Sequence, residues 1–566
     1  MVKWGKGMVR RTANAVGEAV KRGVGEREIR DVFELKEASA FRRFYEAGIF
    51  VWLSLYRGLY RPWHVIPAPS VANPNGRREM YRLNAPKAVC AELAGMVWGE
   101  EAGIRVNSKG WKPRRDAAGA VGGDPLDEFV QAVLKRNAFY ERTQAMIESA
   151  LALGGAAVKV WGETREQATG NREQGNREDA EPAIRIGYCM ADQFVPLSWD
   201  SARVYEGVFI SRRERGGYRY TRLEWHERDG GMYRVRNELY RSEAPNGAPV
   251  GEEKDILGVR CPLAEVYPEL DEETEIETRD SLFSYFRTPI ANNLDPNSPL
   301  GMSVYGNALE TLRALDICYD SFVSEFRLGK KRIIVPARCV RMVADPQTGQ
   351  LRRYFDATDE TYEAFAADDA DGLKIVDNSV ELRVEEHVAA LNAFLSVLCL
   401  QLGFSANTFS FDRREGLRTA TEVVSENSKT FKTVRTVQNQ LRPAFEHMVK
   451  NIIDVAALYG VKWRGQSVER LAAGGYEVKV VFDDGVTQDR QTNIDEGIRL
   501  VGAGLLSRFT FLTDRKYGQG LTAAEAAAEL ARIREEQRTT VMEEDETGAK
   551  RERRGEHGQD HCEPGV

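Results

Sequence analysis

The stretch that most constrains how this chain can fold is Gly403–Phe431, a polar segment between two helical patterns. Before it, apolar residues recur at three- and four-residue spacing, which predicts an amphipathic helix over 384–402. After it, the same spacing predicts a helix over 419–460, which would be ~60 Å long at ~1.5 Å per residue. The connection between them, 405–418, exceeds the ~2–8 residues typical of helical bundles. A connection of this length is expected to be functional or mobile.

The sequence of the long helix contains a capping pattern at its start and a proline in its middle. Thr419 or Thr421 can cap its first free amides, and Glu422 stands three residues after Thr419, as a capping box requires. Pro443 lies inside the pattern. It should kink the helix or end its first half, because proline has no amide hydrogen to donate and its ring clashes with the preceding turn.

Length, charge and cysteine usage limit the class of protein. The chain has 566 residues and a formal net charge of −7. It can therefore form roughly two to four structural units, and it is not a basic protein that grips nucleic-acid phosphates over its whole surface. Seven cysteines without a CxxC pair favour a reducing compartment. No long apolar run follows the first residues and no stretch approaches ~18 apolar residues, so neither a signal peptide nor a membrane span is predicted.

The first half of the chain begins with helical periodicity. A helix rich in aromatic residues is predicted over 37–60, and Pro62 should close it. A second helix is predicted near Asn84 and a third over 126–153, which ends at a glycine pair.

The periodicity then changes to two. Alternating apolar residues predict short strands separated by glycine- and aspartate-rich turns, which indicates an antiparallel region within an α+β domain. The strands are expected at 157–161, 184–199, 204–212, 218–227 and 232–240. The polar, nearly duplicated tract 165–178 is predicted to be a solvated loop between two of them.

The second half predicts a small insert between two helices. A helix over 303–328 is stopped by Gly329, and the helix over 384–402 follows an insert of ~50 residues, far more than a simple helical hairpin needs. The insert should contain strands at 332–336, 339–343 and 374–376, a turn at 345–349 and a helix at 359–367. We therefore expect a separate small subdomain on a two-helix stalk.

The C-terminal part returns to mixed structure. A strand is predicted over 476–482, and helices are predicted over 487–501 and 522–536. The last ~25 residues are charged and nearly without apolar side chains, so they are expected to be disordered.

Motifs for catalysis or metal binding are incomplete. Leu328–Lys331 lacks the Ser or Thr and the earlier glycine of a phosphate-binding loop, and it lies at a helix end, where the helix dipole alone explains the lysines. Asp368, Asp369 and Asp371 resemble the start of a calcium loop that lacks its twelfth-position glutamate. The six histidines show no metal-ligand spacing. We therefore expect a protein that is not an enzyme and uses no cofactor or metal.

Three segments have distinctive amino-acid sequences. They read SPLGMSVYGNALETLRALDICYDSF at 298–322, FRLGKKRIIVP at 326–336, and GFSANTFSFD with TATEVVSENSKTF within 403–431. The chain resembles the portal proteins of tailed bacteriophages, the ring at the capsid vertex through which genomic DNA enters and leaves. The resemblance covers most of the chain and is best over 285–460. It is weak in the strand region and absent from the C-terminal tail.

The resemblance implies an α+β, multi-domain portal architecture that forms a closed ring. Its parts would be a basic N-terminal arm (1–30), a wing of helices and antiparallel strands (31–285) with the polar loop 165–178, a connector and first stem helix (286–328), a clip (329–381), a second stem helix (382–404), a tunnel loop (405–418), a long spine helix and a wing strand (419–485), crown helices (486–540) and a disordered tail (541–566).

The resemblance also implies a function and partners. Portal proteins form cyclic rings, usually of twelve subunits, whose channel carries double-stranded DNA during packaging and ejection with weak, non-specific contact. The clip would dock the terminase large subunit, in which ATP hydrolysis resides, and later the head-completion and tail adaptor proteins. The wing would meet the major capsid protein and the scaffolding protein. The expected location is the portal vertex of the virion, and the host cytoplasm during assembly, with no membrane.

Two groups of residues are implied to lie near DNA or the packaging motor. The first is the tunnel loop, with Asn407, Phe409, Phe411, Arg413, Arg414 and Arg418. The second is a basic cluster at the junction of stem and clip, with Lys330, Lys331 and Arg332. A net-negative ring with a few loop arginines would let the DNA slide, because a channel that bound the phosphates tightly would stall packaging. Exposed surface charge without a partner remains the competing interpretation for both groups.

Two other functions remain open. One is a metal-dependent enzyme that processes nucleic acid, with Asp368, Asp369 and Asp371 as metal ligands. The other is a monomeric virion adaptor with a coiled-coil spine. The mass of the particle in solution would separate a ring from a monomer.

Overall fold

The fold is described by a computed structural model. It describes residues 48–69, 73–99, 102–111, 123–163, 183–200, 203–243, 257–278, 280–294, 296, 298–329, 332–334, 342–344, 351–353, 376–378, 381–406, 408–411, 427–482, 490–514, 518, 521 and 526–535. The predictions for 1–30, 165–178, 359–367 and 541–566 lie outside these ranges. No helix within the described ranges is long and apolar enough to cross a membrane.

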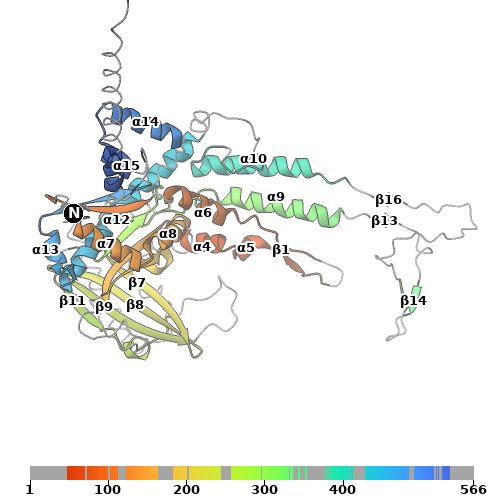
Figure 1. Cartoon of the computed structure of the whole chain (residues 1–566). Helices are drawn as coiled ribbons and strands as arrows, with labels where there is room; N and C mark the ends of the chain where they lie inside the picture. Colours follow the sequence, from red (N-terminus) through yellow and green to blue (C-terminus); the bar gives the residue numbers. More distant parts are fainter. Residues whose placement is uncertain are drawn as a thin grey trace, which may run out of the picture.

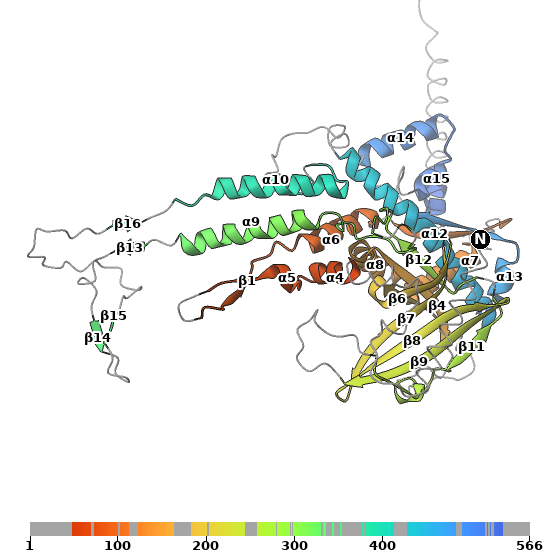
Figure 2. The same cartoon turned by 180° about the vertical axis from the view of Figure 1, so that it is seen from behind.

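The chain forms a body of helices and sheets from which two long helices project side by side (Figures 1 and 2). These helices are α9 (Leu309–Leu328) and α10 (Val384–Leu402), and both were predicted from their periodicity. Gly329 follows α9, as expected, but α9 begins later than the predicted residue 303. The residues before it form turns that pack in the body.

The N-terminal helices differ from the prediction at Pro62. Helix α4 ends at Tyr56, and Pro62 lies in the first turn of the short helix α5 rather than closing the preceding one. Proline is well accommodated there, because the first amides of a helix have no partner within it. The elements of this region are α4 (Phe50–Tyr56), α5 (Arg61–His64), the antiparallel pair β1 (Val65–Pro67) and β2 (Arg77–Glu79), and the predicted helix α6 (Ala85–Val97).

The single helix predicted over 126–153 is wrong, because the structure has two. Helix α7 (Pro125–Arg136) and helix α8 (Phe139–Leu153) are separated at Ala138, whose φ of 48° is left-handed. The buried Asn137 side chain donates to the Ile184 carbonyl and accepts from the Ile186 amide, each at 2.9–3.0 Å. Asn137 thus joins the break to a neighbouring strand, a tertiary contact that periodicity does not reveal.

The antiparallel region is confirmed and forms two sheets. The single strand predicted over 184–199 is wrong, because a 3-10 turn at Ala191–Gln193 divides it into two strands that belong to different sheets. One has the order β12–β4–β5, and the other has the order β10–β9–β8–β7–β6 with β11 paired to β9. The strands are β4 (Gly155–Glu163), β5 (Ala183–Met190), β6 (Phe194–Trp199), β7 (Val204–Arg215), β8 (Tyr218–Asp229), β9 (Met232–Glu243), β10 (Val259–Cys261), β11 (Glu273–Ile276) and β12 (Phe283–Arg287), with 3-10 turns at Ala191–Gln193 and Leu263–Glu265.

The connection from the sheets to α9 requires two glycines in close approach. The Gly301 backbone crosses Gly154, and a Cβ on Gly301 would lie 2.1 Å from the Gly154 carbonyl oxygen. Thr288 bridges the crossing, because its amide donates to the Gly154 carbonyl and its hydroxyl donates to the Met302 carbonyl. This crossing fixes the root of α9 on the end of α8.

The helix after the polar segment is the longest described element. Helix α12 spans Ser428–Leu458. Pro443 lies inside it and does not end it, because the helix continues to Leu458. The prediction of a start at Thr419 falls outside the described residues, as does the capping by Thr419 or Thr421. Asn427, which precedes Ser428, makes no side-chain cap.

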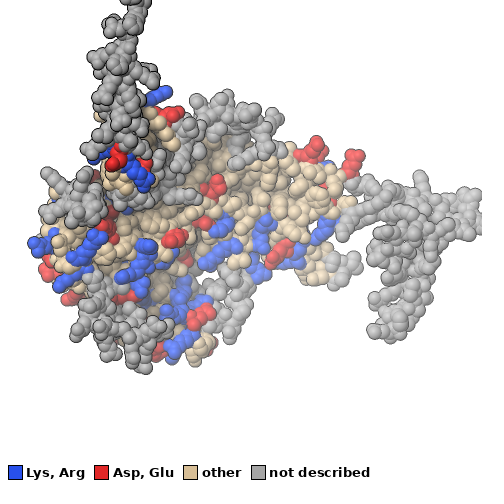
Figure 3. Space-filling view, in the orientation of Figure 1, with Lys and Arg blue, Asp and Glu red and all other residues tan. Residues whose placement is uncertain are grey.

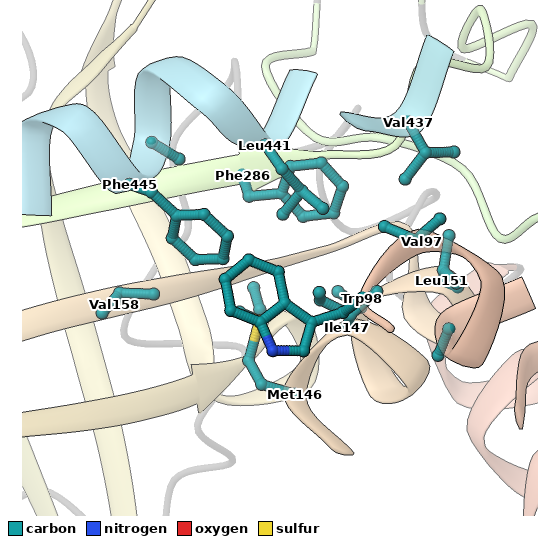
Figure 4. Packing of buried hydrophobic residues seen from close by; sticks show 14 of the residues in the cluster. Val97, Trp98, Met146, Ile147, Leu151, Val158, Phe286, Val437, Leu441 and Phe445 are labelled. Carbon is teal, nitrogen blue, oxygen red and sulfur yellow. The ribbon is translucent and has the colours of Figure 1, made fainter. Parts of the chain in front are cut away.

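The body is centred on the buried side of α12. Figure 4 shows the Trp98 ring between Leu441 and Phe445 of α12 and Met146 of α8. Ring centroids lie 5.3 Å apart for Trp98 and Phe445, and 5.7 Å apart for Phe139 and Phe445. Helix α12 therefore shares one core with α6 and α8.

The chain after α12 returns to the N-terminal part. Strand β19 (Tyr476–Val481), predicted from alternation, pairs antiparallel with β3 (Gly103–Ser108), which was not predicted. The remaining elements are β17 (Lys462–Trp463), β18 (Gln466–Ser467), α13 (Val468–Ala472), α14 (Arg490–Gly502), α15 (Arg508–Thr513) and a helix over 526–535.

Short strands are described within the predicted insert between α9 and α10. Strand β13 (Arg332–Ile334) pairs with β16 (Val376–Asn378), and β14 (Met342–Ala344) pairs with β15 (Leu351–Arg353), both antiparallel. The first pair joins the chain leaving α9 to the chain entering α10. The second agrees with the hairpin predicted around 345–349.

Candidate channel and docking elements

Helices α9 and α10 are joined along an apolar seam. The seam residues of α10 are buried and recur at helical spacing, and they belong to the same hydrophobic core as buried leucines of α9, the helix that α10 contacts. They are Leu391, Leu395, Leu398, Cys399 and Leu402 on α10, with Leu312 and Leu315 on α9. Hydrophobic burial therefore makes the two-helix projection one unit.

The end of α10 is held on α12 by two threonines. Gly403 ends α10 in a left-handed conformation with φ of 79°, which glycine adopts without strain. The Thr433 hydroxyl donates to the Gly403 carbonyl at 2.6 Å, and the Ser405 amide donates to the Thr430 hydroxyl at 2.9 Å. The first residues of the polar segment are thus held against the long helix.

The described aromatic residues of the predicted tunnel loop lie in different surroundings. Phe409 is half-buried and packs edge-to-face on the buried Phe404, with ring centroids 5.4 Å apart. Phe411 is 58 % exposed, and its amide donates to the Asn392 side chain of α10 at 3.0 Å. The chain therefore turns back along α10 before residue 412.

The other tunnel-loop residues lie outside the described ranges. These are Asn407, Arg413, Arg414 and Arg418. Within the basic cluster, Lys330 and Lys331 also lie outside, whereas Arg332 pairs through its backbone with Asn378. That both groups face DNA or the motor stays a prediction.

A charged clamp joins α9 and α10 at the far end of the projection. The Arg383 guanidinium donates to both Glu325 carboxylate oxygens, at 3.1 and 2.8 Å, and His387 Nε2 lies 3.8 Å from one of them. The Arg383 hydrogen bonds lower the pKa of Glu325 to about 2. The carboxylate therefore stays ionised at neutral pH, and the clamp closes the projection next to the insert.

Two aspartates of α9 hold the N-terminal elements against the projection. Asp316 accepts from the Leu83 amide and contacts His64 Nε2, each at 3.0 Å. Asp320 accepts two hydrogen bonds from the Arg78 guanidinium, at 2.7 and 2.6 Å, and one from the Tyr81 amide at 3.0 Å. The Arg78 hydrogen bonds hold the pKa of Asp320 below its ordinary value.

Replacing Asp320 with asparagine is expected to lower the free energy of unfolding by about 1–2 kcal/mol at pH 7, a modest loss because Arg78 lies partly in water. The folded-state pKa of Asp320 is depressed, so its contribution is complete above pH ~4 and is lost as the pH falls through the folded value. Denaturant unfolding of both proteins at pH 7 and pH ~3 should show the difference shrinking in acid.

A matched control for this prediction is the exposed pair of Arg82 and Glu79, whose charged atoms are 3.3 Å apart. Glu79→Gln is expected to change the free energy of unfolding by less than ~0.5 kcal/mol. An equal effect of Asp320→Asn and Glu79→Gln would contradict the structural role given to Asp320.

Sequence reasoning missed the contacts that hold this region together. The hydroxyls of Thr430 and Thr433 lie inside a helix, where threonine carries no distinctive signal. Arg383 and Glu325 are far apart in the chain, so only the predicted pairing of the two stem helices could have suggested their contact. Within the described residues, no group of three or more His, Cys, Asp or Glu side chains could hold a metal, and Asp368, Asp369 and Asp371 lie outside those residues.

The part of the chain that the structure describes is organised around the projecting pair α9 and α10, which is held on the body at its base. A family model described as phage portal protein, SPP1 Gp6-like, matches residues 34–542. The chain therefore belongs to this family of phage portal proteins, structural capsid proteins that serve in genome packaging. This confirms the family predicted from the three sequence segments. A comparison with curated proteins finds no match.

Proposed function

We propose that this portal protein forms a closed ring of twelve subunits, through which double-stranded DNA is packaged and ejected. The family match over 34–542 carries this proposal. The order of parts supports it, because two apposed helices connect an insert at one end to a polar segment at the other. One such projection per subunit would surround a channel along the ring axis.

The polar segment after Gly403 would supply the tunnel loop. Its root is held by Thr430 and Thr433, and the proposal places the residues that follow Phe411 in the lumen. Arg413, Arg414 and Arg418 would give weak phosphate contact that allows sliding. The proposed role of the loop is to touch DNA during translocation and to retain it afterwards.

The two ends of the molecule would dock different partners. The clip at 329–381 would bind the terminase large subunit during packaging and adaptor proteins later, with Lys330, Lys331 and Arg332 near the contact. The wing would meet the major capsid and scaffolding proteins. ATP hydrolysis would belong to the terminase, and the protein itself would act without a cofactor, at the vertex of the virion and in the host cytoplasm during assembly.

The mass of the purified protein tests the ring. A particle of about twelve times 63.6 kDa is expected by sedimentation or light scattering, and axial views by electron microscopy should show a central hole. Closed rings form because a head-to-tail contact repeats until the rotation closes. A monomer at every concentration and salt would refute the proposal and favour the adaptor hypothesis.

A further inference from the structure

The face of α10 opposite its seam with α9 has no partner within the described residues. Residues 388–402 contain no charged side chain, although only one side of the helix is buried. On the opposite side, Leu400 is 68 % exposed and Val397 is 45 % exposed, and Ala389 and Ala393 are also exposed. We call these four residues the outer face of α10.

The outer face is unlike a surface that meets water. The outer face is uncharged, and Ser396, the exposed polar residue beside these four, donates its hydroxyl to the Asn392 carbonyl of the same helix at 2.9 Å. Contiguous apolar surface of this kind marks an interaction site. Two exposed aromatic residues extend the surface: Phe394 is 37 % exposed, and Phe411 is 58 % exposed beside Asn392. A channel wall beside hydrated DNA would leave this apolar area in water.

We infer that the outer face of α10 contacts the neighbouring copy of this chain and does not line the DNA channel. The inference rests on the ring proposed above and assigns one of its contact surfaces. Alanines at 389 and 393 would let a neighbouring element approach closely, and Val397 and Leu400 would fill its surface.

Charge on the two sides of the projection indicates which surface of the neighbour is used. The chain entering α10 carries three exposed acidic residues beside Arg383, which is paired with Glu325. The opposite flank, formed by α4, α5 and β2, carries three exposed arginines beside Glu79, which is paired with Arg82. Figure 3 shows acidic side chains at the upper tip of the projection and basic ones along its lower edge. The residues are Glu381, Glu385 and Glu386 on one side and Arg57, Arg61 and Arg77 on the other.

The basic flank also offers apolar surface. Leu59 is 40 % exposed and Tyr81 is 44 % exposed on the same segment. The outer face of α10 is bordered by acidic residues, and the apolar surface on the flank of α4, α5 and β2 is bordered by arginines. The two surfaces are therefore complementary when one copy lies beside the next. Because the two faces differ, the contact is head-to-tail, which is the type of contact that closes into a ring.

Leu400→Lys in the full chain tests the apolar centre of the proposed contact. Val259→Lys is the control, because Val259 is also 68 % exposed but lies on the edge strand β10. Leu400→Lys is expected to weaken assembly at least about tenfold, measured as the protein concentration at which rings dissociate in sedimentation. The thermal unfolding of the isolated subunit should be unchanged. The control should assemble like the unmodified protein.

Charge reversal tests the choice of partner surface. Glu385→Arg with Glu386→Arg, and separately Arg61→Glu with Arg77→Glu, should each weaken assembly. An equimolar mixture of the two variants should restore it, because every contact then joins opposite charges again. Failure of the mixture to recover would reject this flank as the contact.

Other outcomes separate this inference from the ring itself. Rings of Leu400→Lys that are as stable as the unmodified ones would overturn the assignment and leave the ring intact. Intact rings with defective packaging would place the outer face in the channel instead. Intact rings with a less stable subunit would mean that the chain's own residues cover the face. A monomeric unmodified protein would refute the ring, and the inference with it.

Discussion

Replacing Phe445 with alanine is expected to lower the free energy of unfolding by about 3–5 kcal/mol, the usual cost of removing a fully buried phenylalanine. Phe445 is 0 % exposed and contacts Trp98 and Phe139, so it joins α12 to the ends of α6 and α8. The cavity would open where three elements meet, and backbone that is already packed cannot collapse to fill it. Denaturant unfolding followed by far-ultraviolet circular dichroism measures the loss.

Two variants control this experiment. Phe445→Leu keeps most of the side-chain volume and should cost less than the alanine variant. Leu505→Ala removes a side chain that is 78 % exposed and should change the free energy of unfolding by less than ~0.5 kcal/mol. If Phe445→Ala resembled Leu505→Ala, the central position given to Phe445 would be wrong.

Shortening the tunnel loop by removing residues from 406–416 is expected to leave rings intact and to abolish packaging or retention of DNA. A loop contributes little to a core formed elsewhere, whereas its loss removes the proposed contact with the moving duplex. Thr408 contacts the Thr430 hydroxyl of α12, and Phe409 packs on the buried Phe404, so a deletion limited to 412–416 is the cleaner variant. Packaged DNA is measured by nuclease protection, with ring assembly measured in parallel.

The charge of the loop can be tested apart from its length. Alanine at Arg413, Arg414 and Arg418 should keep rings intact and alter packaging or retention in a salt-dependent way, since phosphate contacts weaken as salt rises. Val259→Lys, remote from the loop, supplies a surface-charge control. Normal packaging by both the shortened and the alanine variants would reject the tunnel-loop assignment.

Local patterns predicted the helices and strands whose periodicity is strong. The spacing of Leu391, Leu395, Leu398 and Leu402 placed α10, and alternation placed β4, β7, β8 and β9. Predictions failed where a tertiary contact decides the outcome. Asn137 binds the backbone of β5 and separates α7 from α8, which a local window cannot detect. Likewise, β3 becomes a strand because β19 returns to pair with it.

The candidate site was less accessible to sequence reasoning than the fold. The resemblance indicated the tunnel loop and the basic cluster by position, and most of those residues lie outside the described ranges. The clamp of Arg383 on Glu325 and the threonines that hold Gly403 and Ser405 depend on geometry. By contrast, the absence of charge over 388–402 was visible in the sequence, and its meaning emerged only when one side of α10 was found exposed.

The projection leaves the middle of the chain and is rooted twice in the same body. Helix α9 is rooted through the crossing of Gly301 and Gly154, and α10 is rooted through Gly403 on α12. A pulling load at the far end would therefore divide between two parallel rods, joined at the tip by Arg383 and Glu325. A force applied there would therefore reach both the sheets, through α9, and the long helix, through α10.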